Sequence, residues 1–435
     1  MKIPEVILIE VDHAPGVLSK VLAVVGEAQL TIEGLSMVTR TQSKTVWELT
    51  IEVNEEENYD LTGRINRLEC AEVIGLSDRV FNQHRGGKIE TVSKLGIHNL
   101  EILRDIYTPG VARVCLAIEE HIKLADEYTG ISNTVAIVTN GTAILGLGNI
   151  GPVAGMPVME GKAALFNQLA GLSGVPILID SKDPEVIIQT VKAISPTFGA
   201  IQLEDIAAPE CFEIERRLQA ELNIPVLHDD QHGTAVVVLA ALLSATRAVK
   251  RDLKECSVGQ IGLGAAGLGI TSLLIEYGVA KVYGADLNPA ATEQLEENGG
   301  FKASLTELME TCDIVVATTG VKGLIKPEWV RPGQLIFALS NPEPEIDPAD
   351  ALEHGAAFAA DGRNVNNVQA FPGLFRGAAN AGAKRFTSKM LFAAAESISA
   401  HTPDNQLVPN PLDKEIHQHI ATAVYEAART SGATV

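Results

Sequence analysis

The sequence predicts an α/β protein in which a small βαββαβ unit precedes two larger units built on mostly parallel sheets. From about residue 90 onward, short apolar runs that end in polar residues alternate with helical stretches, which is the pattern of a parallel sheet covered by helices. A glycine-rich turn at residues 262–267 stands between a strand-like run and a helical one, as in dinucleotide-binding units. Residues 1–80 carry a separate pattern of strands and helices.

Composition restricts the class of protein. The 435 residues suffice for about two or three domains, and the 46% of hydrophobic residues can fill a large core. A net charge of -21 argues against a nucleic-acid partner. The chain starts without a signal-peptide pattern, and no apolar stretch is long enough to span a bilayer. Five scattered cysteines lack metal-ligand spacing. We therefore expect a cytoplasmic protein with reduced thiols and no membrane partner.

The predicted N-terminal unit, residues 1–80, follows the order βαββαβ. Its first helix has apolar residues at helical spacing from Val17 to Val25, and Pro15 and Gly16 mark the turn before it. The predicted elements are a strand at 6–11, a turn at 12–16, a helix from 17, strands near 31–40 and 44–53, a helix opened by Glu55-Glu56-Glu57, and a strand near 73–76.

The N-terminal unit resembles an ACT regulatory domain through the string after its first strand, Asp12-His13-Ala14-Pro15-Gly16-Val17-Leu18. The resemblance implies that two such units pair and bind an amino acid or a similar small effector at this turn. The effector-facing residues would be Asp12, His13, Pro15, Gly16, Val17 and Leu18. The alternative is a ferredoxin-like dimerisation module without a ligand. A polar stretch with two glycines, within residues 81–90, is predicted to be a linker.

A second unit is predicted at residues 91–231. Its strand-like runs are 135–139, 176–180, 200–204 and 225–228, and an apolar helix follows at 232–249. Parallel sheets carry their chemistry at the carboxyl ends of the strands. Two acidic pairs, Glu204-Asp205 and Asp229-Asp230, stand at such ends.

These acidic pairs predict a site for Mg²⁺ or Mn²⁺. Carboxylates that converge repel one another and raise one another's pKa unless a cation neutralises them. An all-oxygen ligand set selects a hard divalent ion. Because neighbouring side chains of an extended segment point in different directions, we expect only one of Asp229 and Asp230 to be a ligand. Solvated loop acids are the alternative interpretation.

The last unit, residues 232–435, is predicted to be a Rossmann-type NAD(P)-binding domain. Its strands are expected at 257–262, 281–286, 313–318 and 334–339. The glycines would let the backbone approach a pyrophosphate at the start of the next helix. Asp286 ends the second strand, where a carboxylate binds the ribose hydroxyls and repels a 2′-phosphate, so NAD is favoured and NADP is possible. The expected cofactor residues of this turn and strand are Gly262, Gly264, Ala265, Ala266, Gly267 and Asp286.

Residues of about 85–400 resemble the malic enzymes, specifically the short-chain prokaryotic type. The supporting strings are Tyr107-Thr108-Pro109-Gly110-Val111-Ala112, Leu145-Gly146-Leu147-Gly148-Asn149-Ile150-Gly151, Val158-Met159-Glu160-Gly161-Lys162, Ile201-Gln202-Leu203-Glu204-Asp205, Asp229-Asp230-Gln231-His232-Gly233-Thr234-Ala235, Ser340-Asn341-Pro342, and Asn366-Asn367 followed by Phe371-Pro372-Gly373. Larger relatives have an arginine where this chain has Ala143, so another cation must meet the second carboxylate of the substrate.

The resemblance implies a role for each matched residue. Lys162 is the implied general base, Tyr107 the general acid, and Asp229 a carboxylate that supports the base. The implied metal ligands are Glu204, Asp205 and Asp230. The implied amides beside substrate and nicotinamide are Asn341 and Asn367, with Asn341 also on the cofactor side.

The resemblance also implies the reaction, which is metal-dependent oxidative decarboxylation of L-malate to pyruvate and CO₂ with reduction of NAD(P). Two alternatives stay open. A malolactic reaction would release lactate and CO₂, and an ACT-containing sensor would have an inactive catalytic region. ACT pairing and the family both suggest a homodimer or a larger homo-oligomer.

Overall fold

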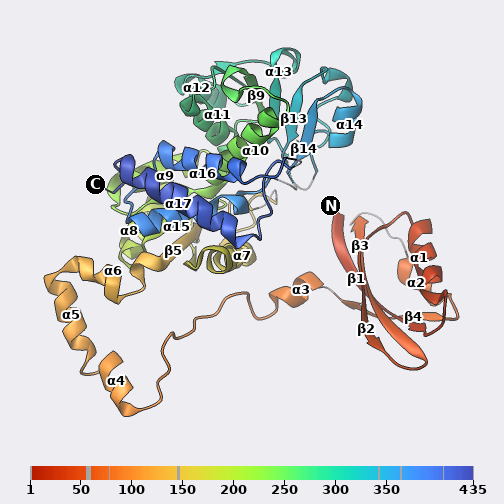
Figure 1. Ribbon diagram of the computed structural model, residues 1–435, viewed down its shortest axis with the longest axis horizontal. Coiled ribbons are helices and arrows are strands. Elements are labelled where there is room, and N and C mark those ends of the chain that lie inside the picture. Colours follow the sequence, from red (N-terminus) through yellow and green to blue (C-terminus); the bar gives the residue numbers. More distant parts are fainter. Residues whose placement is uncertain are drawn as a thin grey trace. The chain divides into compact units, whose positions relative to one another are not determined.

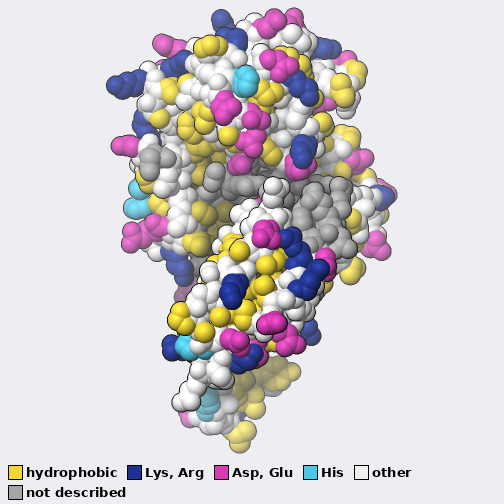
Figure 2. Space-filling model, turned by 90° about the vertical axis from the view of Figure 1, so that its right-hand side faces the viewer, with side chains coloured by type: hydrophobic (Ala, Val, Ile, Leu, Met, Phe, Trp, Pro, Cys, Tyr) yellow, Lys and Arg dark blue, Asp and Glu magenta, His cyan; other side chains and the backbone are white. Residues whose placement is uncertain are grey.

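A computed structural model describes residues 2–54, 60–77, 79–144, 147–340, 343–362, 365–404 and 406–434. The chain forms two compact units, Met1–Lys88 and Ile89–Val435 (Figure 1). Among the described residues, no helix has the length and apolar character needed to cross a membrane. On the face that Figure 2 shows, Lys and Arg side chains are interspersed with Asp and Glu.

The first unit is a four-stranded antiparallel sheet with the strand order β2-β3-β1-β4. The elements are β1 (Lys2–Asp12), α1 (Val17–Glu27), β2 (Thr31–Arg40), β3 (Lys44–Asn54), α2 (Leu61–Asn66) and β4 (Ala71–Ser77). The predicted βαββαβ order is confirmed. The second helix begins at Leu61, whereas Glu55-Glu56-Glu57 lie outside the described residues.

Alternation along β1 and helical spacing along α1 build the core of this unit. Ile7, Ile9 and Val11 point to one face of the sheet, since side chains of a strand alternate between faces. Val21 and Val25 of α1 cover that face, four residues apart on one side of the helix. A short helix, α3 (Arg79–His84), then forms within part of the stretch predicted to be a linker.

The second unit begins with a segment of short helices that leads to the first parallel sheet. These helices are α4 (Leu100–Ile106), α5 (Val111–Glu120), a 3₁₀ turn (Ile122–Leu124) and α6 (Ala125–Tyr128). None of their residues is buried. Figure 1 shows α4 and α5 apart from the helices that pack on the sheets of the same unit.

The first parallel sheet has four strands in the order β6-β5-β7-β8. Its elements are β5 (Thr134–Thr139), α7 (Pro152–Ala170), β6 (Ser173–Leu178), α8 (Pro184–Ile194), β7 (Ala200–Leu203), α9 (Glu210–Glu221) and β8 (Val226–His228). After β8 the chain makes a π-helical turn, Asp229–Gly233, and enters the apolar helix α10 (Thr234–Ala248).

The second parallel sheet has six strands in the order β11-β10-β9-β12-β13-β14. In chain order this is 3-2-1-4-5-6, the arrangement of Rossmann dinucleotide-binding folds. Its elements are β9 (Ser257–Ile261), α11 (Ala265–Tyr277), β10 (Lys281–Ala285), α12 (Pro289–Glu297), β11 (Phe301–Lys302), α13 (Leu305–Thr311), β12 (Ile314–Ala317), β13 (Leu335–Ala338), α14 (Pro348–Glu353) and β14 (Phe358–Asp361). The predicted α/β fold class is confirmed, while the ACT assignment stays a prediction.

Three C-terminal helices return to the first sheet, so that one hydrophobic core joins both sheets. They are α15 (Phe371–Ala381), α16 (Ser388–Ala400) and α17 (Lys414–Thr430). Phe166 of α7 makes edge-on ring contacts with Phe371 and Phe375 of α15. The same core contains Ile137 of the first sheet and Phe337 of the second. Because such cores are closely packed, they hold the ends of the two sheets in a fixed relation.

Candidate active site

Lys162 is a buried cation at the centre of the acidic cluster. It lies on α7 and is only 8% exposed. Its Nζ lies 2.5 Å from Asp229 Oδ2 and 3.1 Å from Glu204 Oε1. The ring of Phe371 covers the amine at 4.5 Å. A buried ammonium needs such partners, because its desolvation would otherwise be very unfavourable.

The acids come from the ends of two adjacent parallel strands. Glu204 and Asp205 follow β7, and Asp229 and Asp230 follow β8. One carboxylate oxygen each of Glu204, Asp205 and Asp230 lies within 4.8 Å of the others. Asp205 has a positive φ of 54°, a strained backbone conformation that aspartate tolerates better than most residues. Its backbone N–H donates to Asp230 Oδ2 at 2.8 Å, which ties the two strand ends together.

Asp229 and Asp230 have different partners. Asp229 faces Lys162, whereas Asp230 accepts from the backbone of Asp205 and lies 3.3 Å from His228 Nε2. This divergence is what the extended chain predicts for neighbouring residues. The oxygen set of Glu204, Asp205 and Asp230 suits a hard divalent cation, because it offers carboxylates and no sulfur or imidazole ligand.

Burial and charge act in opposite directions on the pKa values of this cluster. Burial raises the pKa of Glu204 and of Asp229, and the charge of Lys162 opposes that rise only in part. Burial by itself lowers the pKa of Lys162, but the Asp229 and Glu204 carboxylates outweigh it, so the net shift is upward.

Sequence reasoning missed the residues that support the turn after β8. Glu215, buried on α9, accepts from the backbone N–H of His228 at 2.8 Å and lies 3.0 Å from His232 Nε2. Burial raises the pKa of Glu215, but His232 and His228 outweigh that effect and the net shift is downward. A signal was present, because Glu215 falls on the same helix face as the buried Cys211 and Leu218.

The dinucleotide turn has the expected backbone geometry. Gly262 has a φ of 87°, which favours glycine, and α11 begins three residues later. A Cβ on Gly267 would lie 1.9 Å from the carbonyl oxygen of Gly262, so this position has no room for a side chain. Asp286 Oδ2 accepts from the backbone N–H of Leu263 at 2.6 Å, and its Oδ1 accepts from Asn288 at 2.7 Å. The carboxylate is therefore fixed beside the turn.

The remaining predicted residues have different placements. Asn367 lies beside the turn after β8, since a Cβ on Gly233 would come within 3.5 Å of its Cβ. Asn341 lies outside the described residues. Tyr107, between α4 and α5, is 69% exposed and is not among the described residues that contact Lys162.

The predicted effector turn belongs to the first unit. Asp12 pairs with Lys44 at 3.1 Å, and His13 Nδ1 lies 2.9 Å from the hydroxyl of Thr45. Gly16 has a φ of 79° at the start of α1. Val17 is buried, whereas Pro15 is exposed and Leu18 half-buried. The turn thus has its own fixed contacts, and its effector role stays a prediction.

Comparison with known proteins adds an independent finding. Residues 86–219 match the family description "Malic enzyme, N-terminal domain", and residues 231–294 match "Malic enzyme, NAD binding domain". The chain is 56% identical to NAD-dependent malic enzyme 1 of Bacillus subtilis over 98% of both chains. It is 41% identical to NAD-dependent malic enzyme of Geobacillus stearothermophilus over 95% of this chain and 92% of the relative. The crystal structure of malic enzyme from Pyrococcus horikoshii matches with a TM-score of 0.77 and 38% identity, over 82% of this chain and 91% of that one.

Proposed function

Because the chain belongs to the malic enzyme family, we propose that it catalyses oxidative decarboxylation of L-malate to pyruvate and CO₂ with reduction of NAD. The observation that carries the proposal is the buried Lys162 beside the three carboxylates Glu204, Asp205 and Asp230. This reaction needs an amine and a site for a hard divalent cation at one place. The amine would accept the proton of the substrate hydroxyl, and the cation would hold the negative charge of the carboxylates.

Glu204, Asp205 and Asp230 would hold Mg²⁺ or Mn²⁺, and their oxygens already lie close enough to share one ion. When bound, the cation would polarise substrate oxygens as a Lewis acid, and NAD would accept the hydride. Lys162 would accept the proton of the C2 hydroxyl as C2 is oxidised. Since carboxylates hold the pKa of Lys162 high, it can act as a base only when their charge is neutralised.

Two further residues complete the proposed proton transfers. Asp229 orients the amine of Lys162 through the short contact between them. Tyr107 would donate a proton to C3 after the neighbouring carboxylate has left as CO₂, which yields pyruvate. Asn367 lies beside the turn that carries Asp229, in a place suited to orient the substrate. Asn341 is proposed as a further amide for substrate and cofactor.

We propose NAD as the preferred cofactor because Asp286 is held at the end of β10, close to the glycine-rich turn. A fixed carboxylate there repels a 2′-phosphate and accepts from ribose hydroxyls. Leu287, which follows it, is fully exposed and offers no cation for that phosphate. The neighbouring turn residues, Gly262, Gly264, Ala265, Ala266 and Gly267, would receive the pyrophosphate.

We also propose that the first unit is an ACT-type regulatory unit in a cytoplasmic homo-oligomer. Its strand order and the turn at residues 12–18 support the ACT assignment. The edge strand β2 exposes Met37 and Val38 by 53% and 51%, as a strand that meets another copy would. The free cysteines support a reducing compartment.

The direct test is to follow absorbance of the reduced nicotinamide with L-malate, Mn²⁺ and either NAD or NADP, while pyruvate, lactate and CO₂ are quantified. We expect reduced NAD and pyruvate in equal amounts, and slower reduction of NADP. Lactate without net reduction of NAD would instead identify a malolactic reaction. No malate turnover with either cofactor would overturn the enzymatic assignment in favour of a sensor.

A further inference from the structure

Glu345 is a fully buried carboxylate that lies outside the cluster around Lys162. It belongs to the segment after β13, and its exposed fraction is 0%. Among the residues that the structure describes, no Lys, Arg or His side chain pairs with it, and its hydrogen-bond donors are all neutral. Burial of a carboxylate without a cation is unfavourable for folding unless other donors compensate it. Such a group therefore needs an explanation beyond core packing.

The carboxylate of Glu345 joins the segments that follow two adjacent strands. Its Oε1 accepts from the backbone N–H of Thr319 at 2.6 Å and from the hydroxyl of Thr319 at 2.8 Å, shortly after β12. The same oxygen accepts from the hydroxyl of Ser340 at 2.5 Å, shortly after β13, and Oε2 accepts from the backbone N–H of Ser340 at 3.4 Å. Because one carboxylate holds both segments, neither segment can shift without breaking these bonds.

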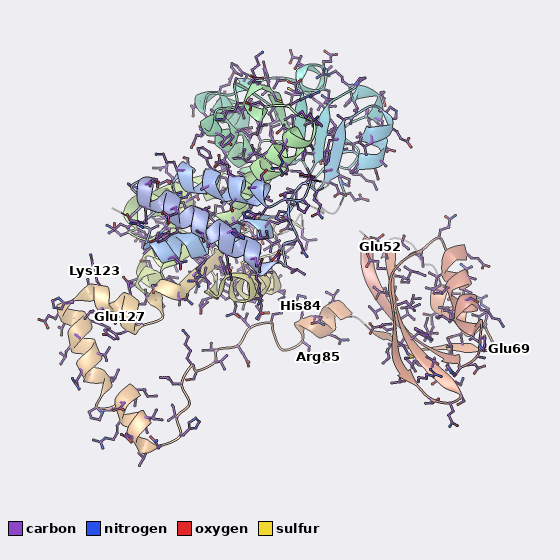
Figure 3. All side chains as sticks on the ribbon, in the orientation of Figure 1. Glu52, Glu69, His84, Arg85, Lys123 and Glu127 are labelled. Carbon is purple, nitrogen blue, oxygen red and sulfur yellow. The ribbon has the colours of Figure 1, made fainter. Side chains whose placement is uncertain are left out.

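Further hydrogen bonds run between the same two segments. The N–H of Gly320 donates to the hydroxyl of Ser340 at 2.7 Å, and the N–H of Gly323 donates to the carbonyl of Pro344 at 3.3 Å. Since β12 and β13 are parallel neighbours, both segments leave the sheet at its carboxyl edge. Figure 3 shows this sheet with its side chains at the top of the view. We call residues 319–325, 340 and 343–345 the paired segments.

The paired segments border the part of the sheet that would receive the nicotinamide half of NAD. A Rossmann sheet binds a dinucleotide across the point where the strand order reverses, which here lies between β9 and β12. Asp286, at the end of β10, is placed to bind the adenosine ribose, so the other half of the ligand falls over β12 and β13. Thr319 also lies close to the glycine-rich turn, because a Cβ on Gly262 would come within 3.0 Å of its Cγ2.

The adenosine half of the site has supports of its own. Asp286 Oδ2 accepts from the backbone N–H of Leu263 at 2.6 Å. The buried side chain of Gln260 donates to the carbonyl of Gly262 at 3.0 Å and to the hydroxyl of Thr318 at 2.8 Å. None of these bonds involves Glu345. Loss of the Glu345 carboxylate should therefore disturb the paired segments and spare the glycine-rich turn.

We infer that Glu345 is a positioning residue for the nicotinamide half of NAD. It acts through Thr319 and Ser340 and does not touch the ligand itself. Because its carboxylate already orders the paired segments, NAD does not have to order them when it binds. The same bonds fix the residue directly before Asn341, the proposed amide for substrate and cofactor. This inference rests on the proposed use of NAD, and it adds a residue that no sequence motif indicated.

The binding of two ligands to full-length variants tests the inference. NADH contains both halves of the cofactor, whereas ADP-ribose lacks the nicotinamide. In Glu345→Ala the ligand itself must order the paired segments, so the Kd of NADH should rise by about 10-fold. The Kd of ADP-ribose should stay at the wild-type value, which also shows that the glycine-rich turn is folded. Both constants are measured by calorimetry, and the fluorescence of NADH gives a second reading of its binding.

Asp313→Ala is the matched control. The Asp313 carboxylate accepts from the backbone N–H of Ser257 at 2.9 Å and from its hydroxyl at 2.7 Å, so it joins the starts of β9 and β12 at the opposite edge of the same sheet. This variant should bind both ligands like the wild type. Glu345→Gln keeps an oxygen that can accept from Thr319 and from the Ser340 hydroxyl, so it should recover most of the affinity for NADH.

Two results would overturn the inference. An equal loss of affinity for NADH and ADP-ribose in Glu345→Ala would show that the residue supports the whole domain, and an unchanged Kd of NADH would show that the paired segments do not act on the cofactor. If Glu345→Ala does not fold, Ser340→Ala, which removes one of the donors, is held to the same two criteria. A wild-type protein that binds ADP-ribose but not NADH would instead overturn the proposed use of NAD.

Discussion

At the scale of single residues, Lys162 is the group on which the chemistry depends. Lys162→Ala should lower kcat for malate oxidation by roughly 10²–10⁴-fold, the usual contribution of a general base. Glu204 loses its ion pair with the lysine, but the other two proposed metal ligands, Asp205 and Asp230, keep their positions because they are bonded to each other and not to Lys162. Mn²⁺ binding, titrated by calorimetry, should therefore survive. Turnover in the variant similar to that of the wild type would remove Lys162 from the mechanism.

Glu215 acts one step away from the substrate, as a positioning residue. Glu215→Ala leaves the backbone of His228 and the ring of His232 without their acceptor, so the turn that carries Asp230 loses its support. We expect about 10–100-fold weaker Mn²⁺ binding, as for other partners of metal ligands. Glu215→Gln keeps an acceptor oxygen and should restore much of that affinity. If the wild type, Glu215→Ala and Glu215→Gln bound Mn²⁺ with equal affinity, Glu215 would have a structural role only.

At the scale of elements, two glycines in the turn from β9 to α11 have different functions. Gly267→Ala forces a Cβ against the carbonyl of Gly262 and should lower the free energy of unfolding by about 1–3 kcal/mol. Gly264 has a negative φ, and a Cβ there would meet no atom within 4 Å, so Gly264→Ala should fold normally. It should nevertheless weaken NAD binding, because the pyrophosphate approaches the backbone there. Thermal unfolding and NAD titration of both variants distinguish the packing role of Gly267 from the binding role of Gly264. Equal stability and equal NAD affinity in the two variants would contradict these separate roles.

The sequence predicted these elements well where the signal is local. Helical spacing located α1, and short apolar runs next to turn residues located β1 and the strand that precedes the glycine turn. The π-helical turn at residues 229–233 was not predicted, since its geometry depends on Glu215, which is close in space and distant in sequence. The acids of the site were predictable from their place at strand ends. The position of Tyr107 was not, because it stands between two short helices without buried residues, where no local burial pattern fixes its place.

At the scale of the whole molecule, the first unit should regulate and the second should catalyse. The chain splits at Lys88, and the carboxylates, Lys162 and the glycine turn all lie beyond it. Deletion of residues 1–80 should keep malate-dependent NAD reduction within a few-fold of the wild type but abolish any response to amino acids, because the turn at 12–18 is lost. The rate of NAD reduction with each amino acid added measures the effector response, and sedimentation measures the assembly, in the wild type and in the shortened chain. If the shortened chain kept the same response and the same assembly, the first unit would be neither the effector site nor a pairing module, and the ACT interpretation would fail.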